Sequence, residues 1–376
     1  MASLETALIH QQISPEITGA VVPPLVQSTT FNRDPNGEFI EGRDVYTRAS
    51  NPNRRLIENK LALLEKGTDA ACFASGQAAT MSIFHSLGQN SHVILPDDIY
   101  YGTRVILENL YKIWNINLTV VDMSNSMNIQ KAIRPNTKLV WIESPSNPCL
   151  KIADIETISE ICTHSGILTA VDNTWASPYF TNPLALGADI VMHSTTKYLG
   201  GHSDILGGAV IWGNKLDPDK AQYIKDYQSI GGGVPSPYDC WLLNRSLSTF
   251  FVRLAKHNSN AAELSSFLNT HPNIQKVYYP GLLSHQNHEV AKKQMSNGFG
   301  GMMSILIKGD EKNCLRVASK LKVFQHATSL GGVESLVDHR RTAEGVHSLS
   351  AGNLLRISVG IENIKDLIED FAQALS

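Results

Sequence analysis

The segment HSTTKYLGGHSD, residues 193–204, follows the apolar run ADIVM at residues 188–192, which is typical of a buried parallel strand. Lys197 lies in the turn after that strand, between the hydroxyl residues Ser194 and Thr196. Hydroxyl groups and glycines around a lysine suit a bound phosphate better than a packed core. A lysine partly withdrawn from water has a lowered pKa, so its neutral amine can attack a carbonyl carbon. The alternative interpretation is an exposed loop lysine.

A second segment, AVDNTW at residues 170–175, strengthens the functional interpretation of Lys197. Residues 167–171 predict another buried strand, which would deliver Asp172 to the carboxyl edge of the sheet, where open α/β sheets bind ligands. Such a pair is typical of pyridoxal phosphate enzymes: the lysine binds the cofactor aldehyde, and the carboxylate keeps the pyridine nitrogen protonated. Asp-Asn-Thr could instead cap a helix. The two segments together favour the cofactor.

Composition limits the other classes of function. The chain has 376 residues, 42% of them hydrophobic and 18% charged, with a net charge of −3, which is typical of a globular protein with room for two packed units. It has no basic stripe for nucleic acid, no apolar run long enough for a membrane span and no signal pattern, so we expect a cytoplasmic protein. The five scattered cysteines lack metal-ligand spacing and are expected to be reduced thiols.

The pattern along the chain predicts three parts: an N-terminal arm at residues 1–50, a large domain at 51–235 and a C-terminal domain at 236–376. In the large domain a helix is expected at residues 54–66, with alternating helices and strands after it, as in a doubly wound α/β layer. Further parallel strands are expected at residues 93–95, 118–121 and 139–142, with residues 209–212 as the edge of the sheet. The C-terminal domain is predicted to contain a long amphipathic stretch at 236–268, strands at 276–279 and 302–307, and a last helix at 363–375.

Three other motifs follow or begin predicted elements. Gly76 opens a helix, whose free amide groups attract phosphate. Tyr100 follows a strand and could stack on a flat ring or act as an acid–base group. Its neighbour Tyr101 is interpreted as a surface tyrosine with ordinary packing. Asn147 also follows a strand, where it could hydrogen-bond a ring hydroxyl or a substrate carboxylate.

These motifs together resemble the Cys/Met-metabolism family of pyridoxal phosphate enzymes, which includes cystathionine γ-synthase, cystathionine γ-lyase, cystathionine β-lyase and methionine γ-lyase. The resemblance runs nearly end to end. It covers residues 46–48, 51–52, 75–76, 100–103, 143–148, 171–174, 193–204, 278–282, 329–335 and 354–360.

The resemblance implies a fold type I architecture, α/β, with a mainly parallel sheet in the large domain and a smaller C-terminal α/β domain. Lys197 would bind the cofactor covalently and carry protons between substrate atoms. Asp172 would pair with the pyridinium nitrogen, and Tyr100 would stack on the ring and serve catalysis. The remaining cofactor-binding residues would be Gly76, Gln77, Thr174, Ser194 and Thr196, joined by Tyr46 and Arg48 from a neighbouring subunit.

The resemblance also implies how an amino-acid substrate binds. Arg356, with Ser329 and Asn147, would clamp the α-carboxylate. The family usually forms tetramers, dimers of dimers that share active sites, so a homo-oligomer is expected. The arm at residues 1–50 would then reach a neighbouring subunit. No metal is implied.

The sequence departs from the family at several positions. Val45 and Thr328 stand where γ-acting cystathionine enzymes often have glutamates, and Tyr101 replaces a usual glycine. Arg340 and Arg341 lie in a segment that differs from the family pattern and is shorter. They could meet an anionic distal group of the substrate, or they could be a solvated surface pair, which is the favoured interpretation.

The expected reaction is γ-replacement or γ-elimination on a homoserine-derived or sulfur amino acid, as in cystathionine γ-synthase. Residues 329–332, SLGG, resemble the γ-acting members. One alternative is cystathionine β-lyase, because Trp175 makes the sequence similar to some of those enzymes. The other is cystathionine or methionine γ-lyase. A nicotinamide-dependent dehydrogenase would need GxGxxG after its first strand, and the sequence has none there. A catalytically silent protein is disfavoured by the intact set of Lys197, Asp172, Tyr100 and Arg356.

Overall fold

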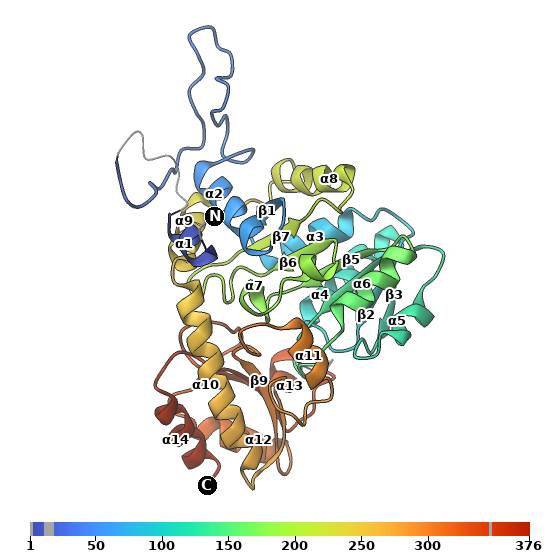
Figure 1. The fold of residues 1–376 in the computed structure, drawn as a ribbon, viewed down its shortest axis with the longest axis vertical. Coiled ribbons are helices and arrows are strands. Elements are labelled where there is room, and N and C mark those ends of the chain that lie inside the picture. Colours follow the sequence, from blue (N-terminus) through green and yellow to red (C-terminus); the bar gives the residue numbers. More distant parts are fainter. Residues whose placement is uncertain (1–2, 11–18, 346–347) are drawn as a thin grey trace.

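The computed structural model describes residues 3–10, 19–345 and 348–376. In these parts of the chain the strands form two sheets, and helices pack on both (Figure 1). The larger sheet lies in the N-terminal two-thirds of the chain and the smaller one near the C-terminus. The predicted α/β class is confirmed, while the domain boundaries after residues 50 and 235 stay predictions.

The larger sheet has seven strands within the described residues, in the order β1-β7-β6-β5-β4-β2-β3. They are β1 (Asp69–Phe73), β2 (His92–Pro96), β3 (Asn117–Val121), β4 (Thr137–Glu143), β5 (Leu168–Asp172), β6 (Ile190–His193) and β7 (Gly208–Trp212). All five strands from β2 to β6 run parallel, as predicted. The largely apolar sequences of β2, β4, β5 and β6 fit burial on both faces, whereas β3, at the edge of the sheet, is partly exposed.

The prediction that residues 209–212 form the edge of this sheet is wrong. The strand β7 lies between β1 and β6 and is antiparallel to both. The true edge on that side is β1, which was not predicted because its sequence, DAACF, is short and contains two alanines with little strand propensity. The position of a strand within a sheet depends on its partners, which local sequence does not specify.

Helices cover the larger sheet on its two faces (Figure 1). They are α2 (Pro52–Leu64), α3 (Gly76–His85), α4 (Tyr101–Val105), α5 (Met127–Ala132), α6 (Ile155–His164), α7 (Ser177–Phe180) and α8 (Pro218–Ser229). A π-helix, Ile106–Leu110, and 3-10 turns at Tyr111–Trp114 and Pro183–Leu186 complete the connections. The helix predicted at 54–66 begins earlier, at Pro52, because the side chain of Asn51 caps it by accepting the Asn53 N–H (2.9 Å).

The smaller sheet has the order β10-β11-β12-β9-β8. Its strands are β8 (Ile274–Tyr278), β9 (Met302–Ile307), β10 (Gln325–His326), β11 (Leu336–Asp338) and β12 (Leu354–Ser358). Its helices are α9 (Pro237–Leu247), α10 (Phe250–Thr270), α11 (His288–Gln294), α12 (Glu311–Lys320), α13 (Arg340–Glu344) and α14 (Ile364–Ala374). The stretch at 236–268 is therefore two helices, and the long α10 connects the region of the larger sheet to the smaller one (Figure 1).

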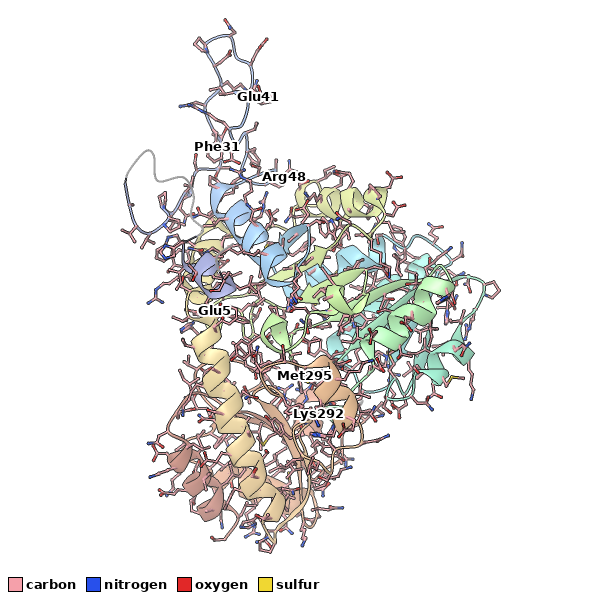
Figure 2. The ribbon with its side chains drawn as sticks, viewed as in Figure 1. Glu5, Phe31, Glu41, Arg48, Lys292 and Met295 are labelled. Carbon is pink, nitrogen blue, oxygen red and sulfur yellow. The ribbon has the colours of Figure 1, made fainter. Side chains whose placement is uncertain are left out.

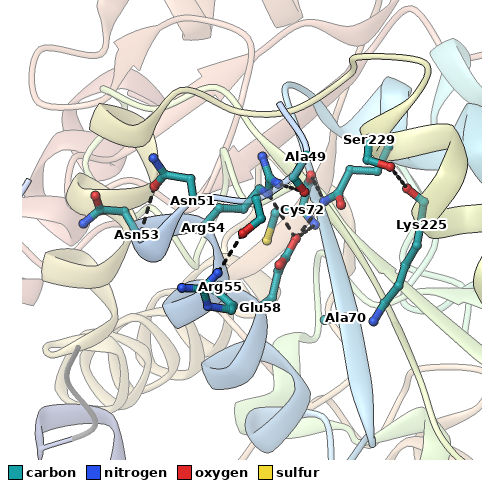
Figure 3. Close-up of polar contacts among 12 residues, drawn as sticks. Ala49, Asn51, Asn53, Arg54, Arg55, Glu58, Ala70, Cys72, Lys225 and Ser229 are labelled. Carbon is teal, nitrogen blue, oxygen red and sulfur yellow. Dashed lines mark hydrogen bonds and ion pairs between the residues drawn. The ribbon is translucent and has the colours of Figure 1, made fainter. Parts of the chain in front are cut away.

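The N-terminal arm is anchored to the body at both of its ends. Its first helix, α1 (Leu4–His10), buries Leu8 against the core, and the Lys60 amine donates to the Leu8 carbonyl. Val26 is held against α2, where its N–H donates to Asn53 Oδ1 (2.9 Å), and the chain between Phe31 and Arg48 projects away from the body, with Glu41 far out on this projection (Figure 2). At its base the Arg54 guanidinium donates to the carbonyl oxygen of Ala49 (2.7 Å; Figure 3). A contact of this arm with a neighbouring subunit stays a prediction.

The described residues lack two features that would point to other classes of protein. Among them, no helix has the length and apolar character needed to cross a bilayer. The same residues contain no group of three or more His, Cys, Asp or Glu side chains placed to hold a metal ion. The cysteines they contain are free, and Cys72 and Cys162 are buried in the core as expected.

Candidate active site

A cavity of about 410 Å³ lies where the carboxyl ends of β4, β5 and β6 face residues of the C-terminal region. This is the edge at which parallel sheets bind ligands. Most of the predicted site residues line it: Gly76, Gln77, Tyr100, Asn147, Asp172, Thr174, Ser194, Thr196, Lys197, Ser329 and Arg356. The two predicted residues that do not line it are Tyr46 and Arg48. Residues far apart in the sequence thus meet in one hollow.

Lys197 is held in the turn after β6 by its backbone. The Lys197 N–H donates to the Ser194 carbonyl (3.2 Å), and the Lys197 carbonyl accepts the Gly201 N–H (2.7 Å). Gly201 has a φ of +67°, and a Cβ there would lie 1.9 Å from the Arg253 guanidinium, so only glycine fits this turn. The turn directs the Lys197 amine to Ser329 Oγ, to which it donates over 2.6 Å.

The environment of the Lys197 amine makes it a usable nucleophile. Burial, assisted by the positive charges of Arg356 and Arg340, lowers the pKa of Lys197 to about 8. An ordinary lysine amine has a pKa of about 10.4 and is almost fully protonated at neutral pH. An amine with a pKa of about 8 has an appreciable neutral fraction, which attack on a carbonyl carbon requires.

Asp172 ends β5 and points a carboxylate into the cavity. The Thr174 N–H donates to its Oδ1 (3.1 Å), but burial still raises the pKa of Asp172. A buried carboxylate with a raised pKa is stabilised in its charged form by a cation beside it. The position therefore suits a protonated ring nitrogen.

Glu143 is a second acid in the cavity, and no role was predicted for it. It ends β4 and is the register partner of Asp172 on the adjacent strand. Burial raises the pKa of Glu143 well above its usual value, and the negative charge of Asp172 adds to this effect. Its Oε2 accepts the Tyr100 N–H (2.9 Å), so Glu143 fixes the start of α4. The signal for it was present, because Glu143 follows a buried strand as Asp172 does.

On the side away from the cavity, Glu65 joins the ends of β5 and β6, the strands that carry Asp172 and lead to Lys197. Its Oε1 accepts from Asn173 Nδ2 (2.7 Å) and lies 2.6 Å from His193 Nε2. Asn173 follows Asp172, and His193 precedes Ser194, so one buried carboxylate ties together the two strand ends that face the cavity.

The start of α3 forms a cradle that suits an anion. Ser75 caps this helix by accepting the Ala78 N–H (3.1 Å), and the first helical residue is Gly76. A Cβ on Gly76 would lie 2.9 Å from the Cβ of Ser194, so the glycine keeps the two segments in contact. The Ser194 N–H in turn donates to Thr174 Oγ1 (2.9 Å). Helix-start amide groups beside hydroxyl side chains are a suitable phosphate site.

Tyr100 lies at the mouth of the cavity with 44% of its surface exposed. Gly102 allows its ring to fold back, because a Cβ there would lie 2.5 Å from the ring and 2.3 Å from the Gln77 amide nitrogen. The exposed face of such a ring can stack on a flat heteroaromatic ligand. Tyr101 is partly exposed as expected, yet it also lines the cavity and is therefore part of the site.

Arg356 lies on β12 and is buried at the side of the cavity formed by the C-terminal region. It donates from Nη1 to Asn147 Oδ1 (3.3 Å) and from Nη2 to the Ser329 carbonyl (3.1 Å). Burial lowers the pKa of Arg356 to about 10, which leaves it positively charged at neutral pH. Ser329 has a φ of +87°, a left-handed conformation rare for serine and often found at functional sites.

Arg340 and Arg341 occupy very different environments. Arg340 is buried, lines the cavity and pairs with Asp338 (2.8 Å) and Glu344 (2.6 Å), so the surface interpretation is wrong for it. The Arg341 side chain is 54% exposed and pairs loosely with Glu311 (3.7 Å), so for Arg341 that interpretation is right. Neither Asp338 nor Glu344 was predicted, because their contacts depend on how β11 and α13 pack.

Tyr46 and Arg48 are exposed and lie outside the cavity of their own chain. Arg48 Nη1 donates to the Ser229 carbonyl (2.6 Å), which places Arg48 at the base of the arm near α8 (Figure 2). Its guanidinium lies 5.8 Å from the centre of the Tyr46 ring. Their part in a neighbouring subunit's site stays a prediction.

The residues present fit pyridoxal phosphate. The cavity offers an amine of lowered pKa for the aldehyde, a buried carboxylate for the ring nitrogen and an anion cradle for the phosphate. The glycine that opens the cradle is required by its contact with Ser194.

Comparison with known proteins agrees with this geometry. Residues 5–376 match the family described as Cys/Met metabolism PLP-dependent enzyme. A cystathionine gamma-synthase of Mycobacterium leprae is 42% identical over 100% of this chain and 97% of its own. A cystathionine gamma-lyase of Bacillus subtilis is 41% identical over 99% of this chain and 98% of its own, and relatives named cystathionine beta-lyase match at 40%. The crystal structure of metB from Corynebacterium glutamicum superposes with a TM-score of 0.96 at 39% identity, covering 100% of this chain and 98% of that one.

Proposed function

Because the chain belongs to the Cys/Met metabolism PLP-dependent enzyme family, we propose that it catalyses γ-replacement or γ-elimination on a homoserine-derived or sulfur amino acid, as cystathionine γ-synthase does. The observation that carries the proposal is the single cavity that brings together the Lys197 amine, the Asp172 carboxylate and the Arg356 guanidinium. These are the three groups that an amino-acid-transforming site of this chemistry requires.

Each of these residues has a defined task in the proposed reaction. Bound pyridoxal phosphate supplies an electron sink for charge that develops on the substrate's α-carbon. Asp172 keeps the ring nitrogen protonated, and Arg356 with Asn147 holds the substrate's carboxylate. Lys197, once free, takes the proton from the α-carbon and delivers it to other substrate atoms. A base with a pKa of about 8 is well matched to this work near neutral pH.

Ser329 is placed to coordinate the two sides of the site. Its hydroxyl accepts from the Lys197 amine (2.6 Å), and its carbonyl accepts from Arg356 (3.1 Å). The same residue thus orients the proton-transferring amine and the carboxylate-binding guanidinium. Tyr100, at the mouth, would cover the ring and keep water from that face.

The position of the bond that breaks has two candidate answers. The γ-position is favoured by the SLGG segment at residues 329–332 and by the relative named cystathionine gamma-synthase. The alternative, cystathionine beta-lyase activity, is favoured by Trp175, which lines the cavity 6.0 Å from the Arg356 guanidinium, and by relatives of that name. A cystathionine or methionine γ-lyase activity is a further alternative, and a relative named cystathionine gamma-lyase supports the first of these.

Two measurements test this proposal. The protein loaded with pyridoxal phosphate should carry the cofactor on Lys197 after borohydride reduction, and a peptide map should find no adduct on Lys60. Lys60 is the matched control, because burial lowers its pKa to about 8 as well, yet it does not line the cavity. Product analysis with cystathionine, and with O-acylhomoserines in the presence of cysteine as the thiol, should then give 2-oxobutanoate or a new thioether. Pyruvate would instead favour the β-lyase, and an absence of any adduct on Lys197 would refute the enzyme proposal.

We further propose a homo-oligomer, a dimer of dimers, in which residues 19–50 place Tyr46 and Arg48 at a neighbouring cavity. The exposed apolar side chains of Val21 (83%) and Phe39 (61%) on this segment support the proposal. Mixing an Arg48→Ala subunit with a Lys197→Ala subunit should restore part of the turnover if sites are shared between chains. No recovery in stable mixed oligomers would argue against shared sites.

A further inference from the structure

Four side chains of alternating charge form a row of ion pairs from α13 to Arg356, which lines the cavity. Glu344 pairs with Arg340 (2.6 Å), Arg340 pairs with Asp338 (2.8 Å), and Asp338 pairs with Arg356 (3.0 Å). All four side chains are buried or nearly so, at 4 to 11% exposure. Arg356 is the end of this row that binds Asn147 and Ser329.

The backbone fixes the order of these groups. Asp338 on β11 is the register partner of Arg356 on β12, so their side chains emerge from neighbouring antiparallel strands at the same level. Arg340 and Glu344 stand four residues apart in α13, the spacing at which helical side chains meet. The row of ion pairs therefore follows from how β11, β12 and α13 are joined.

Asp338 shares one oxygen between two arginines. Its Oδ2 accepts from both Arg340 Nη1 and Arg356 Nη2. When a carboxylate binds a single guanidinium, its negative charge offsets the positive charge of that one partner. When a second guanidinium binds the same oxygen, the negative charge is divided between the two partners. Arg340 thus leaves Arg356 with positive charge available for another anion. In a buried site such effects are large because water does not screen them.

We propose that Arg340 is a positioning residue for substrate binding: it holds Asp338, and through Asp338 it keeps the Arg356 guanidinium oriented and available for the substrate's α-carboxylate. This inference rests on the proposed function, in which Arg356 binds that carboxylate. Arg340 lines the same cavity, but both of its terminal nitrogens bind acids and only its Nε lacks a hydrogen-bond partner, so it acts through Arg356 rather than as a second bidentate anion receptor.

The test separates the carboxylate from the rest of the ligand. Two probes are titrated into the holoenzyme and followed by the absorbance of the cofactor: L-norleucine, and pentylamine, which is the same molecule without its carboxylate. The dissociation constant of pentylamine divided by that of L-norleucine measures how much the carboxylate contributes to binding. Arg340→Gln should reduce this ratio about tenfold or more, the size expected from weakening one charge-assisted contact, and should leave the affinity for pentylamine within about threefold.

Other variants complete the design. Arg341→Gln is the matched control, because Arg341 is the neighbouring exposed arginine, and its ratio should equal that of the parent protein. Arg340→Lys should recover part of the ratio because it keeps the charge. In an Arg356→Lys background, Arg340→Gln should cause no further loss. Arg340→Met also removes the charge that holds Asp338, so it carries the same prediction as Arg340→Gln and replaces it where that variant does not fold.

Two results would overturn the inference. An unchanged ratio in both Arg340→Gln and Arg340→Met would show that Arg356 does not need Arg340. An equal weakening of both probes would show a general structural role for Arg340. Failure of the proposed function looks different: in that case Arg356→Lys itself would leave the ratio unchanged.

Discussion

The two sides of the cavity are built by different kinds of structure. On one side, Asp172 is the last residue of the parallel strand β5 and Lys197 lies in the turn after β6, so each is placed by its own strand. On the other side, Arg356 lies within the antiparallel strand β12, and its surroundings come from β11, α13 and the loop that holds Asn147. The first, which we call the cofactor side, depends on the local direction of the chain. The second, which we call the substrate side, depends on contacts between distant segments.

The two sides also differ in how their charges are balanced. The cofactor side holds acids whose pKa values burial has raised, Asp172 and Glu143, and these await a positive partner. The substrate side already pairs its charges among Asp338, Arg340 and Arg356. We therefore expect the cofactor side to be stabilised by its ligand, and the substrate side to be organised before its ligand arrives.

The largest effect is expected for Lys197→Ala. Loss of the proton-transferring amine should reduce turnover by about 10²–10⁴-fold or more, because general acid–base catalysis contributes that much. Steady-state rates with an O-acylhomoserine measure this, and circular dichroism checks the fold. The comparison variant is Lys60→Met, which removes the other lysine with a pKa of about 8 and should still bind the cofactor. Undiminished turnover in Lys197→Ala would contradict the assigned role.

Asp172→Asn should next weaken the cofactor side alone. Replacing the carboxylate removes the charge that stabilises a protonated ring nitrogen, and a charge-assisted contact is worth about 1.5–3 kcal/mol. Cofactor affinity should fall by about 10–100-fold in equilibrium dialysis. Thr174→Val would serve as a milder neighbour, because it keeps the carboxylate and the backbone donor of residue 174. A cofactor affinity equal to that of the parent protein would show that Asp172 does not meet the ring.

Arg356→Lys should affect the substrate side alone. Lysine keeps the charge but loses the planar fork, so the KM for the amino acid should rise by about 10-fold while the affinity for the cofactor stays unchanged. The two quantities are measured on the same preparation. A loss of cofactor affinity as large as that of Asp172→Asn would contradict the division into two sides.

The cofactor side was largely predictable from the sequence, for a physical reason. A buried parallel strand followed by polar residues delivers those residues to one edge of the sheet, so the order of predicted strands was enough to group Asp172 and Lys197 in one site. Glu143 obeys the same rule, since it also ends a buried strand, and it could have been found in this way.

The rest depends on contacts that the local sequence does not encode. Arg340 and Arg341 are adjacent and chemically identical, yet one is buried between Asp338 and Glu344 and the other is exposed. Likewise residues 209–212 form an interior strand because β1 pairs with them at the edge of the sheet. The sequence of β1 has too little strand propensity for that strand to be predicted. Burial and sheet order are properties of the assembled chain.

The smallest expected effect is a shift in the pH dependence of cofactor addition to Lys197, caused by the charge of Arg356 on the other side of the cavity. The rate at which pyridoxal phosphate adds to the cofactor-free protein should rise with pH and level off above about 8, because only the neutral Lys197 amine attacks and its pKa is about 8. A nearby positive charge disfavours the ammonium and lowers this pKa, so Arg356→Met should raise the midpoint. Burial remains the largest cause, so the midpoint should stay below that of a free lysine, ~10.4. Stopped-flow absorbance measures the rates, and Arg341→Met should leave the midpoint unchanged. An unmoved midpoint in Arg356→Met would mean that the charge of Arg356 does not contribute to the lowered pKa of Lys197.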